Sequence, residues 1–299
     1  MKTATETESR AIATNLSEIF PEKSYDDLRC QRFDDGISNE NFLVTFANKE
    51  QFALRIVGKS GEGIVDRTDE KFNTSIAAHL GITPEILYFD TKTGLKIASF
   101  IENAETLHNN SIKTEENLSG IAEVLRRLHT SKCRLHKDFN AFTEIARYEQ
   151  LLANTNGAMY DGYEDVRDKV LSLENELNKM GTNVVSCHCD ALPENWIKDP
   201  TGKIWLLDWE YSGMNDPFWD ITTPFIEAGF APSEEKYFLN AYFDGNIPTC
   251  AERKVLIYKI LMDYIWSIWA RVKELKGDSK LHDYGIMRLN RGLNNIKKL

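Results

Sequence analysis

The apolar and polar positions in the first third of the chain are mostly those of strands. Five segments predict strands: residues 29–33, where apolar and polar positions alternate, residues 41–47 and 51–57, which are β-rich, and residues 85–90 and 95–101. The second and third are joined by a short polar link and predict a hairpin. A short helix before Pro21 and a second helix over residues 66–80 are also predicted. We therefore expect a small β-rich lobe over residues 1–101.

After Asn103 the apolar spacing becomes helical. Residues 115–130, 142–154 and 162–180 carry the helical period, and residues 217–299 are again mostly helical. One hairpin interrupts the helices, with strands over residues 196–198 and 203–207 around the turn Asp199-Pro-Thr-Gly202. The pattern predicts an α+β protein whose second lobe, residues 102–299, is larger and mostly helical. A cleft between two lobes is the expected ligand site.

Charge and composition exclude several classes of protein. The chain has 299 residues and a net charge of -10, which argues against a nucleic-acid partner. Its most apolar long stretch, residues 255–272, contains Lys259, Asp263 and Arg271 and does not predict a membrane span. The polar N-terminus and the five cysteines favour a reducing cytoplasm. The sequence does not decide between a monomer and a homodimer.

The densest polar cluster is His188-Cys-Asp-Ala-Leu-Pro-Glu-Asn195, which lies between a short strand and the hairpin. Asp208 follows the second strand of that hairpin. Asn195 and Asp208 offer oxygen ligands for Mg²⁺, and Asp190 can orient a hydroxyl nucleophile. Each residue alone also fits an ordinary turn, because Asp and Asn favour turns. The ordered set is more specific, since unrelated loop acids need not bracket a hairpin.

Two neighbouring signals carry less weight. Cys187 and Cys189 flank His188, but no second Cys/His pair stands at metal-ligand spacing, so zinc is not predicted. His129 has no identifiable partner in the sequence and is expected to be a surface or packing residue. Asp220, at a helix start, is expected to bond loop backbone groups.

The pattern His-x-Asp-x-x-x-x-Asn followed by Asp-x-Glu resembles the aminoglycoside phosphotransferase and choline kinase superfamily, relatives of protein kinases. The string Asp208-Trp-Glu-Tyr-Ser-Gly-Met-Asn-Asp-Pro-Phe-Trp-Asp220 is similar to the choline/ethanolamine kinase family, especially its bacterial choline kinases. The resemblance implies a bilobal, protein kinase-like fold. It also implies ATP- and Mg²⁺-dependent phosphorylation of choline to phosphocholine.

The resemblance implies nucleotide contacts from six residues of the first lobe: Ser38, Asn39, Arg55, Glu70, Ser99 and Ile101. Arg55 lies on the strand where protein kinases carry lysine, and its guanidinium can grip two phosphate oxygens. Glu70, on the following helix, would hold Arg55 in place. Without the resemblance, Arg55 also fits a surface charge on a strand.

The acceptor pocket is expected in the second lobe. Trp266 and Trp269 share a helix face, and converging rings attract a quaternary ammonium by cation–π interaction. Tyr211 and Glu227 match choline-pocket positions of the family, with Glu227 as a countercharge. Glu210 adds a contact beside the metal and the substrate. A tryptophan pair at helical spacing also fits a core, so the rings alone do not establish a pocket.

Two groups of alternatives stay open. Another acceptor within the superfamily is possible, namely ethanolamine, thiamine or an aminoglycoside. A protein that holds nucleotide or choline without phosphoryl transfer is the alternative from a different class. The presence of Asp190, Asn195 and Asp208 argues against such a silent binding module.

Overall fold

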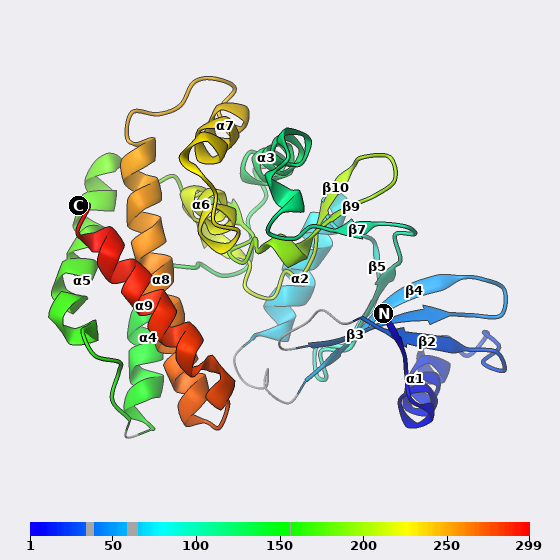
Figure 1. The fold of residues 1–299 in the computed structure, drawn as a ribbon. Helices are drawn as coiled ribbons and strands as arrows, with labels where there is room; N and C mark the ends of the chain where they lie inside the picture. The colour runs from blue at the N-terminus through cyan, green and yellow to red at the C-terminus, as the bar shows by residue number, and fades with distance from the viewer. Residues whose placement is uncertain (34–38, 59–64, 156) are drawn as a thin grey trace. The chain divides into compact units, whose positions relative to one another are not determined.

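The computed structural model describes residues 1–33, 39–58, 65–155 and 157–299. These residues group into two compact units (Figure 1). The first comprises Met1–Leu107 and Glu194–Tyr211, and the second comprises His108–Pro193 and Ser212–Leu299. The hairpin after Pro193 thus belongs with the β-rich unit, whereas the sequence placed it within the helical lobe. The reason is long-range pairing: this hairpin gains a third strand from residues just before His108.

The first unit contains an antiparallel sheet in the order β1-β2-β3-β4-β6-β5. Its strands are β1 (Lys2–Thr3), β2 (Arg29–Arg32), β3 (Asn39–Thr45), β4 (Gln51–Val57), β5 (Ile86–Phe89) and β6 (Lys96–Ser99). The predicted strands are confirmed, including the hairpin of β3 and β4. The alternation of buried residues such as Phe42, Val44 and Leu54 builds the core of the sheet. The two-residue β1 was missed because two positions carry no period.

Two helices accompany this sheet. Helix α1 (Glu6–Ile19) begins with a capping box, in which Thr5 and Glu8 bond each other's backbone N–H groups. It buries Ile12 and Leu16 in the sheet's core cluster. Helix α2 (Arg67–His79) begins at Asp66, whose side chain accepts hydrogen bonds from the first-turn amides. Unlike α1, it buries Glu70, and a carboxylate is buried only where charged partners compensate it.

The predicted hairpin forms β9 (Trp196–Lys198) and β10 (Ile204–Leu206). β7 (Glu105–Thr106), which the sequence did not predict, pairs with β9. The turn is organised by Asp199, whose carboxylate accepts from the Thr201 N–H at 2.8 Å and the Trp205 indole at 3.0 Å. A short 3-10 helix, η3 (Pro193–Asn195), leads into β9. The hairpin thereby fixes the backbone on both sides of Asn195 and Asp208.

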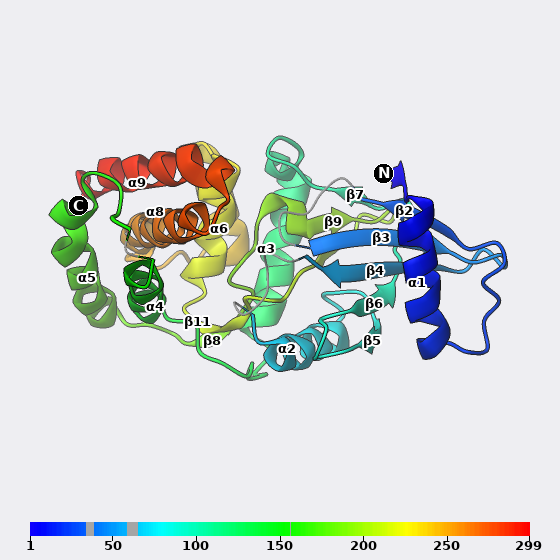
Figure 2. The same ribbon diagram turned by 90° about the horizontal axis from the view of Figure 1, so that it is seen from below.

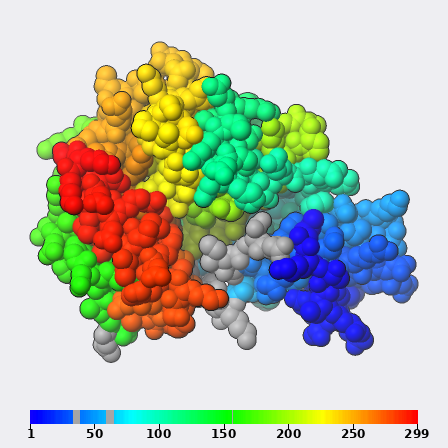
Figure 3. Space-filling model, viewed as in Figure 1, coloured from blue at the N-terminus to red at the C-terminus, as the bar shows by residue number. Residues whose placement is uncertain are grey.

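The second unit consists mainly of helices. They are η2 (Ser111–Lys113), α3 (Glu115–His129), α4 (Ala141–Ala153), α5 (Tyr163–Met180), α6 (Phe218–Glu227), α7 (Pro232–Tyr242), α8 (Ala251–Leu275), η4 (Ser279–Leu281) and α9 (His282–Ile296). Figure 2 shows α8 lying between α4 and α9. In Figure 3, α9 lies on the outer surface of this unit. A two-stranded sheet of β8 (Val185–Cys187) and β11 (Gly213–Asn215) completes the unit.

The close approach of α9 to α8 depends on a small residue. A Cβ atom at Gly292 would lie 3.2 Å from the Cβ of Asp263, which is tighter than an ordinary contact. Side chains of α9 can therefore reach acids on α8. No helix among the described residues has the length and hydropathy needed to cross a membrane, and α8 carries buried charges in its interior.

Candidate active site

Arg55 and Glu70 form a buried ion pair in the first unit. Arg55 lies on β4 and is 4% exposed, and both of its terminal nitrogens bond the Glu70 carboxylate, Nη2 at 3.0 Å. Arg55 Nη2 also donates to the Gly94 carbonyl at 3.0 Å, and Nη1 lies 3.5 Å from Asp208 Oδ1. The structure thus brings Arg55, Glu70 and Asp208 together. Glu70 comes 15 positions after Arg55 in the sequence, and Asp208 comes 138 positions after Glu70. Their functional roles stay predictions.

Two further cations join this cluster. Arg67 Nη1 donates to Glu70 Oε2 at 2.6 Å and to Glu210 Oε2 at 2.9 Å. Lys96, the cross-strand partner of Arg55, donates to Glu70 Oε1 at 3.3 Å. The sequence analysis assigned no role to either residue. For Lys96, the signal lay in the strand register, which sequence periodicity does not reveal.

Burial and charge move the two buried carboxyl groups in opposite directions. Burial alone would raise the pKa of Glu70, but Lys96 and Arg55 outweigh it and lower that pKa to about 2. Burial and the nearby Asp208 carboxylate raise the pKa of Glu210 above its ordinary value. Glu70 is therefore a firmly charged partner of Arg55.

Asn195 and Asp208 are held at the base of the hairpin. The Leu207 N–H donates to the Asn195 carbonyl at 2.8 Å, so the chain segments carrying the two side chains lie together. Asp208 has φ of 60°, a left-handed conformation that non-glycine residues adopt at a cost. Its side chain remains 32% exposed. Oxygen ligands on neighbouring segments, one of them accessible, fit a hard cation such as Mg²⁺.

Asn39 begins β3 and lies in the same unit. Its Nδ2 donates to Glu210 Oε2 at 3.3 Å. Its Oδ1 and the Nε of Arg55 are buried without a hydrogen-bond partner among the described residues. Buried polar atoms are nearly always paired in proteins, so these two atoms mark a place where a further polar group fits.

In the second unit, Asp220 anchors the loop that carries Asp190. Its carboxylate accepts from the backbone N–H groups of His188 at 2.7 Å and Cys189 at 2.8 Å. The expected structural role of Asp220 is confirmed. Cys189 adopts φ of 64°, and the Trp219 indole donates to its carbonyl at 3.0 Å. The loop is therefore held from α6 on both sides of its strained residue.

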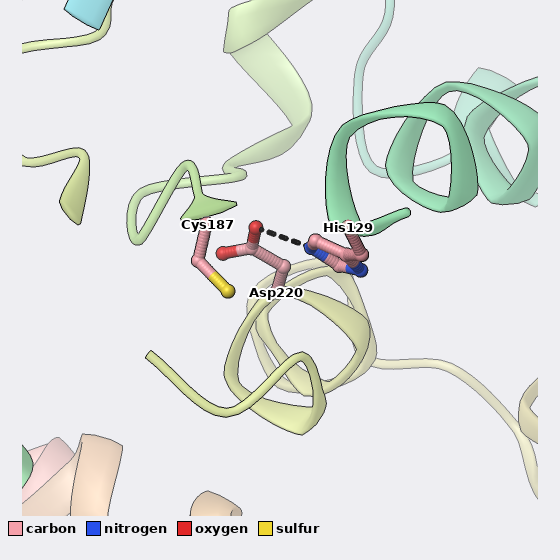
Figure 4. Close-up of side chains that lie close together, drawn as sticks. All are labelled: His129, Cys187 and Asp220. Atoms are coloured by element: carbon pink, nitrogen blue, oxygen red, sulfur yellow. Dashed lines mark hydrogen bonds and ion pairs between the residues drawn. The ribbon is translucent and has the colours of Figure 1, made fainter. Parts of the chain in front are cut away.

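His129 was expected to be a surface or packing residue with no partner identifiable in the sequence. It is buried, and from α3 it supports Asp220. Its Nε2 lies 3.0 Å from Asp220 Oδ2, and its Nδ1 lies 2.7 Å from the Tyr242 hydroxyl. Figure 4 shows the imidazole directed at the Asp220 carboxylate, with Cys187 on the other side. A single histidine in sequence carries no signal of a partner that lies 91 residues away.

The ligand atoms of His129, Cys187 and Asp220 lie within 4.8 Å of one another, which raises the question of a metal ion. Both oxygens of Asp220 already accept backbone hydrogen bonds. Burial raises the pKa of the Cys187 thiol well above its ordinary value, whereas metal binding requires a thiolate. The group is better described as a loop anchor than as a metal site.

Three aromatic rings gather where α8 and α9 pack. The Trp266 and Trp269 ring centroids lie 6.1 Å apart at an interplanar angle of 89°. Tyr284, on α9, lies 6.3 Å from Trp269 at 80°. Trp266 and Trp269 are both partly exposed, unlike the neighbouring core residues Ile265 and Ile268. The two tryptophans are thus less buried than their neighbours on α8, and their role in a pocket stays a prediction. Tyr284 is a ring that the sequence analysis missed.

The remaining predicted residues are placed as follows. Glu227 ends α6, and its carboxylate bonds Arg288 on α9. Ser99 ends β6 and donates its N–H to the Glu85 carbonyl at 2.9 Å, and Ile101 follows it, half-buried. Tyr211 is half-buried in the first unit, so its share in the aromatic pocket stays a prediction. Ser38 lies outside the described residues.

Several known proteins are similar to this chain in sequence and in structure. The family description "Choline/ethanolamine kinase" matches residues 30–264. The choline kinase LicA from Streptococcus pneumoniae is 36% identical, with a TM-score of 0.84, and the match covers 97% of this chain and 100% of that one. A structure of LicA in complex with AMP, also 36% identical, matches with a TM-score of 0.80 over 95% of this chain and 98% of that one.

Two proteins of lower sequence identity are also similar to this chain. Protein LicA of Haemophilus influenzae is 28% identical over 271 residues, which is 88% of this chain and 100% of that protein. An aminoglycoside 2'-phosphotransferase is 12% identical with a TM-score of 0.69, covering 96% of this chain and 98% of that one. At that identity the likeness concerns the fold alone, which the two proteins share.

Proposed function

The chain belongs to the choline/ethanolamine kinase family and is a phosphotransferase, and we propose that it transfers the γ-phosphoryl group of ATP to the hydroxyl of choline. The observation that carries the choice of choline is the group of three rings, Trp266, Trp269 and Tyr284. Aromatic faces attract a quaternary ammonium, which has no N–H to offer a hydrogen-bond acceptor. The choline kinase activity named for the LicA relative supports the same acceptor.

On the nucleotide side, we propose that Arg55 binds the phosphates and that Glu70 holds its guanidinium in place. The paired Nη atoms fix the orientation of Arg55, and its buried Nε still has no acceptor among the described residues. Asn39, with its unpaired Oδ1, and Ser38 are proposed to lie over the phosphates. Ser99 and Ile101 are proposed to contact the adenine. A LicA structure with AMP supports nucleotide binding by this fold.

Asn195 and Asp208 are the proposed ligands of Mg²⁺. Their oxygen donors suit the ion, and the ion pair of the partly exposed Asp208 carboxylate with Arg55 is long, at 3.5 Å. When bound, Mg²⁺ would neutralise phosphate charge that Arg55 alone leaves uncompensated. Glu210, bonded to Arg67 and Asn39, keeps the neighbouring polar groups in position.

Asp190 is the proposed partner of the choline hydroxyl that reacts. In the proposed step, the choline oxygen attacks the γ-phosphorus, the bond to the bridging oxygen of ADP breaks, and the hydroxyl proton passes to the Asp190 carboxylate. The loop needs a fixed geometry for this step. Asp220 fixes the loop by accepting hydrogen bonds from the backbone N–H groups of His188 and Cys189. The Asp190 N–H also donates to His188 Nδ1 at 3.3 Å.

The acceptor is tested by an ADP-release assay with choline, ethanolamine, thiamine and kanamycin side by side. We expect the highest kcat/KM with choline. Turnover with kanamycin or thiamine but not choline would contradict the proposal. No ADP release with any acceptor, together with choline binding by calorimetry, would indicate the silent binding module instead.

We further propose that the protein acts in the cytoplasm on small molecules. Its substrates are water-soluble, and its five cysteines are free thiols. Cell fractionation with an antibody to the protein tests the compartment. Chromatography with light scattering tests whether the protein is a monomer or a homodimer.

A further inference from the structure

Glu227 is part of a charge-balanced cluster. Its carboxylate bonds Nη1 of Arg288, whose side chain is fully buried. Arg288 Nε in turn lies 2.7 Å from Asp263 Oδ1 on α8. Arg291 donates to the same carboxylate at 2.8 Å and 2.9 Å, and to the Ile226 carbonyl at 2.9 Å. Two carboxylates meet two guanidiniums, so the cluster carries no net charge.

This cluster lies directly beside the aromatic rings. Trp266 comes three positions after Asp263 on α8, and Tyr284 comes four positions before Arg288 on α9. Residues at these spacings are neighbours on a helix face. The Arg288 guanidinium carbon lies 5.6 Å from the centre of the Tyr284 ring. The Glu227 carboxylate is therefore already paired with Arg288, which lies beside the Tyr284 ring, before any cationic substrate binds.

Stability alone does not account for Arg288. Arg288 Nη2 is buried without a hydrogen-bond partner among the described residues, and an unmet donor costs stability. Buried ion pairs are also often no more stabilising than apolar residues of similar size. The burial of Arg288 therefore suits a role that depends on its positive charge at this position.

The two candidate acceptors differ in what they need from a pocket. A primary ammonium is strongly hydrated and carries N–H donors, so it needs carboxylate or carbonyl acceptors to replace water. A quaternary ammonium has no donors, so aromatic faces are sufficient. A carboxylate left free at Glu227 would therefore help ethanolamine more than choline.

We propose that Arg288 is a specificity-determining positioning residue: it holds and neutralises Glu227, so that the pocket attracts a cation mainly through its rings and favours a quaternary over a primary ammonium. This inference rests on the proposed function. It also modifies the expected role of Glu227. The negative charge of this carboxylate is balanced by Arg288 and is not left free for the cationic substrate.

The test compares kcat/KM for choline and for ethanolamine in matched variants. Arg288→Met frees the Glu227 carboxylate, and we expect the choline-to-ethanolamine ratio to fall about tenfold. Arg291→Met removes bonds to Asp263 but leaves the Arg288–Glu227 pair intact, so its ratio should stay within about twofold of wild type. Thermal melting checks that both variants fold.

Two further variants sharpen the test: a double variant shows whether Glu227 causes the change seen in Arg288→Met, and a single variant applies if Arg288→Met does not fold. In the double variant Glu227→Gln/Arg288→Met no free carboxylate remains, and the ratio should return toward the wild-type value. Glu227→Gln alone leaves the Arg288 charge uncompensated, so KM should rise about tenfold for both cations. An unchanged ratio in folded Arg288→Met, equal changes in Arg291→Met, or an unchanged KM in Glu227→Gln would overturn the proposal. Wild-type protein that phosphorylates neither amino alcohol would instead overturn the proposed function.

Discussion

The two units each contain a buried cluster of balanced charges, but the clusters differ in their surroundings. In the first unit, Arg55, Arg67 and Lys96 face Glu70, Asp208 and Glu210. In the second, Arg288 and Arg291 face Glu227 and Asp263. In the first cluster the partly exposed member is a carboxylate, Asp208, at 32%. In the second it is a cation, Arg291, at 33%, while Asp263 and Arg288 have no exposed side-chain surface.

The difference shows how one kind of interaction serves two purposes. An open cluster of cations and acids can rearrange its partners around an incoming anion and metal ion. In the second cluster the Arg288–Asp263 pair is fully buried, and the charges cancel. Under the proposal made above, the neighbouring rings then select the cation. Changes in the first unit should therefore affect phosphate handling or stability, whereas changes in the second should separate chemistry from choice of acceptor.

The largest effect is expected at Asp190, in the loop of the second unit. Asp190→Asn removes the proton acceptor and should lower kcat by about 10³-fold while choline binding is retained. ADP release and calorimetric titration with choline measure the two quantities. Asp138→Asn, at an exposed position of the same unit, is the control. Retained turnover in Asp190→Asn would contradict its catalytic role.

A pH effect on stability is expected from Glu70 in the first unit. Its pKa is lowered from 4.5 to about 2 in the folded protein, so its contribution is complete above pH 4.5 and is lost as pH falls toward 2. The full contribution is roughly 3 kcal/mol at neutral pH. Urea unfolding of wild type and Glu70→Gln at several pH values measures it, and the variant should lose this part of the pH dependence.

The control for Glu70 is Glu6→Gln, which breaks an exposed pair with Arg10. Exposed ion pairs contribute little, so this variant should unfold as the wild type does. If Glu70→Gln and the wild type lose stability in parallel over this pH range, the ion-pair cluster is not the source of the effect.

Arg55 should affect the nucleotide rather than the acceptor. Arg55→Met is expected to lower kcat/KM for ATP by about 10²-fold, equivalent to roughly 3 kcal/mol, because a fixed phosphate donor is lost. KM for choline should change little. Arg29→Met, at an exposed position on the neighbouring strand β2, is the control. Equal losses for ATP and choline would point to a general structural defect.

The smallest effect is expected at Trp266, and it sharpens the comparison of the acceptors. Trp266→Ala should raise KM for choline by about tenfold through loss of cation–π attraction. The effect on ethanolamine should be several times smaller. Phe72→Ala, at an exposed position of the first unit, is the control for losing an aromatic ring. Equal effects on both amino alcohols would indicate that Trp266 serves packing only.

Much of this arrangement was predictable because its signals are local in sequence. Alternating and β-rich runs bounded by turns identified the strands from β2 to β6. The motif from His188 to Asp208 identified the kinase family, which the comparisons confirm. The α+β kinase fold and the phosphotransferase activity are confirmed with it. The individual substrate and metal contacts stay predictions.

What escaped prediction depends on register and on distant pairing. Lys96 joins Arg55 only because β6 pairs with β4 in one particular register. His129 meets Asp220 only through the packing of α3. Tyr284, Arg288 and Arg291 do share one helical face, so their spacing predicts a common surface, but it does not show that this surface meets Asp263. Periodicity predicts which residues share a face, but the contacts between distant elements are seen only in the folded chain.

The burial of Cys187 and Cys189 affects how readily the protein reacts with oxidants and electrophiles. The two thiols stand on either side of His188, at the start of the loop that carries Asp190. Both are buried and have pKa values raised well above the ordinary value, chiefly by burial. Attack on such reagents requires an accessible thiolate. Alkylation or peroxide should therefore modify the less buried Cys133 and Cys250 first. A fluorescent label can be attached at those positions while the loop stays chemically untouched.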